Sequence, residues 1–92
     1  MDSSLEAIKE LINQGKIEEA IERLDSYLLT CATDKDKVYY LKGNAYRKLG
    51  NWQQALNSYQ SAIDLNPESA AVNARDAIKD ILSFYNKDMY NQ

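Results

Sequence analysis

The sequence contains no histidine, only one cysteine, Cys31, and only one proline, Pro67. Without an imidazole, the chain cannot form a Cys-His pair or a Ser-His-Asp triad, which excludes the common routes to nucleophilic catalysis. A single cysteine allows no disulfide within the chain, which fits a reducing compartment. We read Cys31 as a small apolar residue near a helix end, and we expect a non-catalytic protein of the cytoplasm.

Motifs that bind cofactors or metals are also missing. No Gly-rich phosphate loop is present, and Asp34-x-Asp36 lacks the glycine and the distal glutamate of a calcium loop. The glutamates of residues 18–22 stand beside Lys16 and Arg23, so they indicate a solvated helix face rather than a carboxylate site. The sequence therefore predicts neither an enzyme nor a cofactor or metal site.

Positive charge and long apolar runs are scarce. The chain has 11 basic and 14 acidic residues among 92, a net charge of −3, so a broad basic face for nucleic acid or an anionic membrane is not expected. Its apolar runs are far shorter than the roughly 20 residues of a membrane-spanning helix. The opening MDSSLEAIKE is acidic and amphipathic, and no signal peptide is predicted.

What the sequence does have is helical spacing. Apolar residues recur at intervals of three and four along almost the whole chain, and no long stretch alternates as a strand would. The spacing predicts five helices joined by very short turns, which favours antiparallel neighbours. Two are marked by the stripes of residues 5–12 and 17–28, and the other three are expected over 38–49, 52–65 and 68 to about 88.

Polar residues that can cap helices precede several of these segments. Ser3 followed by Glu6 fits a capping box, and Asn51 is the expected N-cap of the fourth helix. Either Asp34 or Asp36 is expected to cap the third helix.

The second and fourth helices repeat one another. Residues 15–28 can be laid over residues 50–63 at an offset of about 35 residues, with Gly15 on Gly50 and Ala20 on Ala55. Helix–turn–helix units of about 34 residues that carry W-x2-L-G-x2-Y, A-x3-F and P define the tetratricopeptide repeat. The second unit resembles this family at Tyr39, Gly43, Tyr46, Ala55, Tyr59, Ala62 and Pro67.

The resemblance implies an all-α fold, a right-handed solenoid of helical hairpins (a tetratricopeptide-like superhelix). It divides the chain into a divergent first repeat over 1–35, a second repeat over 36–69 and a capping helix over 70–92. Two features depart from the family pattern: Lys42 stands where a leucine is usual, and the first unit has no proline. Terminal repeats are commonly atypical.

The resemblance also implies a function: an adaptor or scaffold that binds a protein partner, as a peptide or a helix, in a concave groove lined by the first helix of each unit. An asparagine at the place of Asn44 often bonds peptide backbone in this family. Leu5, Lys9, Ile12, Asn13, Lys37 and Leu41 are expected along the groove. The predicted partner-binding residues are Tyr40, Asn44, Arg47, Lys48, Arg75, Ile78, Ile81 and Leu82. Of these, Tyr40, Ile78 and Leu82 would supply apolar contacts, and Arg47 and Arg75 would pair acidic groups. A carboxylate clamp is not expected, since Asn44 and Arg75 match it only in different registers and Ala71 replaces its lysine.

The fifth helix leaves two alternatives open. Its apolar stripe runs from Ala71 through Ile78 to Met89, whereas the family's core positions hold Asp76 and Asp80. Either the helix is rotated and packs this stripe on the fourth helix, or the stripe lines an open groove for a partner helix or a second copy of the chain. The second arrangement would make the protein a self-associating assembly subunit, with a homodimer as the partner.

Overall fold

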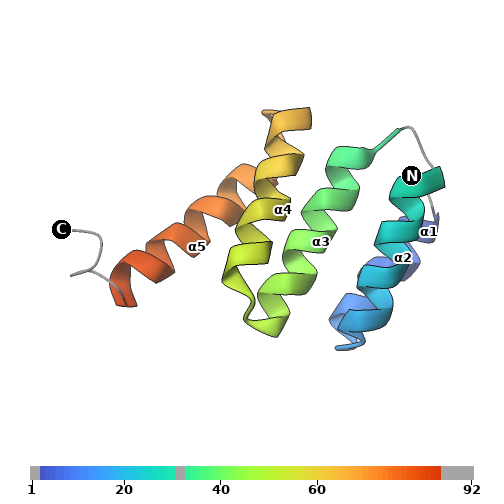
Figure 1. The fold of residues 1–92 in the computed structure, drawn as a ribbon, viewed down its shortest axis with the longest axis horizontal. Coiled ribbons are helices and arrows are strands. Elements are labelled where there is room, and N and C mark those ends of the chain that lie inside the picture. The colour runs from blue at the N-terminus through green and yellow to red at the C-terminus, as the bar shows by residue number, and fades with distance from the viewer. Residues whose placement is uncertain (1–2, 31–32, 86–92) are drawn as a thin grey trace.

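The structure is a computed structural model that describes residues 3–30 and 33–85 (Figure 1). Over these ranges the chain forms five helices and no strand, so the predicted all-α class is confirmed. The helices are α1 (Ser3–Asn13), α2 (Ile17–Thr30), α3 (Lys35–Leu49), α4 (Trp52–Leu65) and α5 (Ala71–Tyr85). The expectations for Cys31 and Met89 concern residues outside the described ranges.

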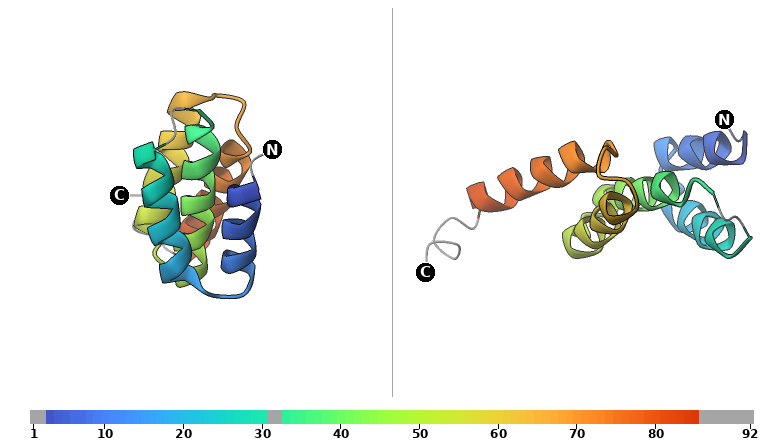
Figure 2. Two further views of the ribbon diagram at one scale, coloured as in Figure 1. Left: turned by 90° about the vertical axis from the view of Figure 1, so that its right-hand side faces the viewer. Right: turned by 90° about the horizontal axis from the view of Figure 1, so that it is seen from above.

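The helices form two antiparallel hairpins followed by a fifth helix. α1 contacts α2 and α3, α2 contacts α3, and α3 contacts α4, which in turn contacts α5. Seen from above, α1 and α5 lie on one side of the molecule and α2 and α4 on the other (Figure 2). This is the layered order of a helical-hairpin solenoid, in which each hairpin buries its apolar face against the next.

Short turns with defined backbone geometry join the helices. Gly50 has φ of 78°, and the Gly50 and Asn51 N–H groups donate to carbonyl oxygens of the last turn of α3. This left-handed conformation favours glycine at the end of a helix. Asn51 then caps α4 as predicted, because its Oδ1 accepts a hydrogen bond from the Gln54 N–H at 3.2 Å.

Two helix starts differ from the prediction. α3 begins at Lys35, before Val38, and Asp34 adopts φ of 60° without a side-chain capping bond. Asp36 lies inside α3, where it accepts a hydrogen bond from the Asn66 side chain, so neither aspartate caps the helix. α5 begins at Ala71 instead of residue 68, because a turn intervenes and the Ser69 Oγ accepts the Ala71 N–H.

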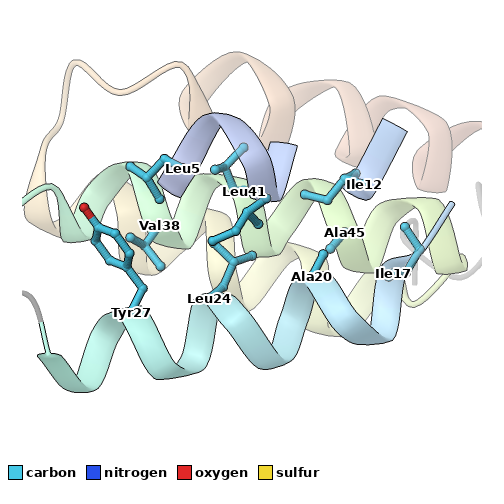
Figure 3. Packing of buried hydrophobic residues seen from close by; sticks show 10 residues of the cluster. Leu5, Ile12, Ile17, Ala20, Leu24, Tyr27, Val38, Leu41 and Ala45 are labelled. Carbon is cyan, nitrogen blue, oxygen red and sulfur yellow. The ribbon is translucent and has the colours of Figure 1, made fainter. Parts of the chain in front are cut away.

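The core consists of two clusters. The first lies between α1, α2 and α3 and includes Leu24, which is fully buried (Figure 3). The second lies mainly between α4 and α5 and is centred on Tyr59 and Ile78, both fully buried. Tyr40 on α3 packs against both clusters, so it joins the two halves of the core.

Lys42, the departure from the family pattern, is accommodated between α2 and α3. Its side chain is only 17% exposed, and its Nζ lies 2.8 Å from Asp25 Oδ1 on α2. The Nζ also lies 6.0 Å from the centre of the Tyr39 ring. The aliphatic stem of Lys42 thus takes the place of the usual leucine while its ammonium reaches a carboxylate at the surface.

α3 packs tightly against Tyr59 of α4 at Gly43. A Cβ at this position would lie 2.9 Å from Tyr59 Cζ and closer still to two other carbons of the same ring. No heavier residue fits without moving Tyr59, which explains the glycine in the middle of a helix.

We expect Gly43→Ala to lower the free energy of unfolding by about 1–3 kcal/mol, since overpacking of this size outweighs the roughly 1 kcal/mol that alanine gains over glycine in a helix. Urea denaturation followed by circular dichroism measures this change. Lys48→Ala, at an exposed position of the same helix, is the matched control and should change stability by less than about 0.5 kcal/mol. An unchanged midpoint for Gly43→Ala would contradict this account of the α3–α4 contact.

Candidate functional site

A groove runs between α1 and α3. Its larger part is a hollow of about 440 Å³ that also reaches the start of α4, and a neighbouring hollow of about 210 Å³ extends it toward the start of α3. Both hollows share Lys9, Leu41 and Asn44, so we treat them as one surface, the α1/α3 groove. Its complete lining is Leu5, Glu6, Lys9, Ile12, Asn13, Lys37, Tyr40, Leu41, Asn44, Arg47, Lys48 and Trp52.

The floor of the α1/α3 groove belongs to the hydrophobic core. Leu5, Ile12 and Leu41 line it and are at least 93% buried, packed within the first cluster (Figure 3). Because core side chains are held by close packing on all sides, this floor is a fixed surface. The polar groups around it are therefore held at set positions relative to one another.

The rim of the groove is positively charged. It carries Lys9, Lys37, Arg47 and Lys48, against a single carboxylate, Glu6. Lys37 forms an ion pair with Asp34 at 3.6 Å, whereas the other three cations have no ion-pair partner among the described residues. The whole chain has a net charge of −3, so the groove concentrates positive charge on an acidic protein.

A buried tyrosine supports the polar centre of the groove from below. Tyr59, on α4, donates its hydroxyl hydrogen to Asn44 Oδ1 at 2.5 Å. Burial raises the pKa of Tyr59, and the nearby positive charge of the Arg47 guanidinium offsets part of that increase. The Tyr40 ring lies 6.0 Å from the Tyr59 ring. Asn44, Arg47 and Tyr40 are thus all in contact with one buried side chain.

The predicted partner-binding residues fall into two separate groups. Tyr40, Asn44, Arg47 and Lys48, all on α3, line the α1/α3 groove. The four predicted residues on α5 line neither of its two hollows: Arg75, Ile78, Ile81 and Leu82.

Most of these α5 side chains already contact other residues of the same chain. Ile78 is fully buried and Leu82 packs against the same cluster, while Ile81 is half-buried. Arg75 donates to Gln60 on α4 and pairs with Asp76. Ile78 therefore has no exposed surface for a partner, so the predicted direct contact at this residue is wrong for this arrangement.

Of the two alternatives for α5, the structure agrees with the first, in which the apolar stripe packs on α4. Ala71 and Ile78 are fully buried in the cluster with α4, whereas Asp76 and Asp80, at the family's usual core positions, are exposed. Carboxylates cannot be buried without a partner, so the helix turns its small and apolar residues toward α4 instead.

Sequence reasoning missed three residues of this site. Glu6 and Trp52 line the groove, and Tyr59 supports it. Asn44 and Tyr59 stand 15 residues apart on different helices, so no local pattern signals their hydrogen bond. Trp52 is the first residue of α4, and it lines the groove because α4 begins beside it.

Comparison with known proteins agrees with the fold. The family model of the tetratricopeptide repeat matches residues 36–69. The solution NMR structure of Bacteroides fragilis protein BF1650 shares 64% sequence identity with this chain, at a TM-score of 0.90, and the match covers 100% of this chain and 92% of that one. The chain belongs to the tetratricopeptide-repeat family. No curated protein sequence matches it.

The tetratricopeptide-repeat match covers α3 and α4, the hairpin that supplies most of the groove's polar residues. In the described residues of this repeat protein, no helix is long and apolar enough to span a membrane. The same residues include no group of three or more His, Cys, Asp or Glu side chains that could hold a metal ion.

The raised pKa of Tyr59 predicts a loss of stability at high pH. The unfolded chain releases this proton near pH 10, while the folded repeat protein retains it, so the stabilisation is complete below pH 10 and declines as the pH rises toward the folded pKa. We expect the free energy of unfolding, measured by urea denaturation, to fall above about pH 10 in the wild type. Tyr59→Phe, which has no ionisable group at this position, should show a smaller fall. If the free energy of unfolding fell equally with pH in the two proteins, the raised pKa of Tyr59 would be contradicted.

Proposed function

We propose that this tetratricopeptide-repeat protein is a non-catalytic interaction module of the cytoplasm that binds an extended, acidic segment of a protein partner in the α1/α3 groove. The observation that supports this most strongly is the charge of the groove. Lys9, Arg47 and Lys48 surround an apolar floor without ion-pair partners among the described residues, on a chain whose net charge is −3. Complementary charge raises both the rate and the specificity of association.

An extended segment fits this groove better than a helix does. Asn13 on α1 and Asn44 on α3 line it from opposite helices, and a side-chain amide can both donate to and accept from peptide groups. Main-chain N–H and C=O groups are free in an extended peptide, whereas those of a helix are mostly bonded within the helix. The groove therefore offers main-chain partners that only an extended segment can use.

The alternative of self-association through α5 has weaker support. The apolar stripe that would form such an interface includes Ala71 and Ile78, and both are already buried against α4. We therefore assign α5 the role of a cap on the second hairpin and the α1/α3 groove the role of the binding surface.

The single tryptophan, Trp52, lines the groove and provides a direct binding signal. We expect its fluorescence to respond to a blocked heptapeptide of alternating glutamate and alanine, and binding to weaken as salt is raised. The same peptide with glutamine in place of glutamate should bind at least several-fold more weakly, because each unpaired cation contributes up to about 1 kcal/mol with a carboxylate.

Charge reversal locates the site. Lys48→Glu should lower the affinity for the acidic peptide by about fivefold or more, since it replaces an attraction with a repulsion at the groove. Lys79→Glu makes the same change of charge at an exposed position of α5 and is the matched control. Equal effects of the two variants, or equal binding of the glutamate and glutamine peptides, would rule out this function for the groove.

A further inference from the structure

Asn44 stands at the centre of the α1/α3 groove, in the part that both hollows share. A side-chain amide has one acceptor oxygen and one donor NH2, and rotation by half a turn exchanges them. Which of the two faces a ligand decides whether the groove recognises an acceptor or a donor. A neighbouring residue that hydrogen-bonds only the oxygen or only the NH2 can fix the orientation of the amide.

Tyr59 is such a neighbour. Its ring is fully buried, so its hydroxyl has no access to bulk water and must find partners within the protein. Arg47 can only donate, so its guanidinium, which lies near the Tyr59 hydroxyl, cannot accept the hydroxyl hydrogen. The hydroxyl hydrogen is then directed to Asn44 Oδ1, at 2.5 Å.

This arrangement leaves the other end of the amide for the groove. Asn44 Oδ1 is engaged by Tyr59, and its Nδ2 donates to no other described residue. Arg47 and Lys9, which line the same hollow, are also donors without acceptor capacity. The middle of the groove consequently offers N–H donors to a ligand.

We infer that Tyr59 is a positioning residue that orients the Asn44 amide so that the groove selects an acceptor oxygen of its ligand. This inference rests on the proposed function, and it makes that function more specific. The acceptor is an oxygen of the acidic segment, either a main-chain carbonyl or a side-chain carboxylate, and a donor group at the same place is disfavoured.

The ring of Tyr59 also fixes where this hydroxyl stands. It fills the space beside Gly43 and is fully buried. A phenylalanine at this position would keep the ring and its packing and lose only the hydroxyl. Tyr59→Phe therefore separates the positioning role from the packing role.

The test measures binding of the alternating glutamate–alanine peptide to Tyr59→Phe through Trp52 fluorescence. We expect the affinity to fall by about three- to tenfold, the usual effect of losing one hydrogen bond that holds a binding group. Tyr46→Phe, which removes a hydroxyl next to the same cluster, is the control and should bind as the wild type does. If the loss persists at high salt, the acceptor is the main-chain carbonyl; if it shrinks with salt, the acceptor is the carboxylate. An unchanged affinity for Tyr59→Phe would overturn the inference.

A second variant tests directly whether the groove needs a hydrogen-bond donor at residue 44. In Asn44→Asp, the carboxylate still accepts the Tyr59 hydroxyl but offers no donor to the groove. We expect binding of the acidic peptide to fall more than tenfold while the urea midpoint stays close to that of the wild type. Retained binding in Asn44→Asp would overturn the inference.

A readout on the free protein keeps this test separate from that of the proposed function. NMR relaxation of side-chain amide nitrogens should show a rigid Asn44 Nδ2 in the wild type and a mobile one in Tyr59→Phe. Asn13, an exposed amide of the same groove, is the internal control and should not change. If no acidic peptide binds but the Asn44 amide becomes mobile in Tyr59→Phe, only the proposed function fails. If Asn44 is equally rigid in both proteins, the positioning role of Tyr59 is wrong.

Discussion

Gly43 has no side chain, and the ring of Tyr59 occupies the space that a side chain would fill. This contact lets α3 and α4 pack closely around the ring, and both the second cluster and the polar centre of the groove include Tyr59. It buries Tyr59 completely, places the second cluster between α4 and α5, and brings a phenol hydroxyl from α4 to the underside of Asn44 on α3. One packing constraint thereby joins the core of the protein to the polar centre of its groove.

The distribution of charge follows from the same layered arrangement. Helices α1 and α3 present Lys9, Lys37, Arg47 and Lys48 to the groove between them. The exposed face of α2 carries three glutamates in its first two turns, with one arginine that pairs with Glu19 at 3.2 Å. An acidic outer face beside a basic groove gives the protein two electrostatically distinct surfaces, although its net charge is small. We expect the field of such a groove to steer acidic segments toward it.

Much of the fold was predictable because it depends on local patterns. The Asn51 cap, the left-handed glycine at Gly50 and the stop before Pro67 are each encoded within a few residues, and each is present. The start of α5 was predicted three residues early, because the Ser69 side chain holds a turn that the spacing of apolar residues does not reveal. The site was only partly predictable. Asn44 and Arg47 follow from their place on the first helix of a hairpin, but the rotation of α5 depends on how Ile78 fits against α4, which is a property of three-dimensional packing.

We propose that ligands bind between α1 and α3 and that α5 covers the second hairpin. The most direct measurement is the change in backbone and side-chain NMR shifts when the alternating glutamate–alanine peptide is added to the isotope-labelled protein. We expect the largest changes at residues that line the larger hollow, among them Asn13, Asn44, Arg47, Lys48 and the Trp52 indole. We expect small changes at Ile81 and Leu82 on α5. The largest changes on α5, with none at Asn13 and Asn44, would contradict this proposal and place the binding surface on the last helix.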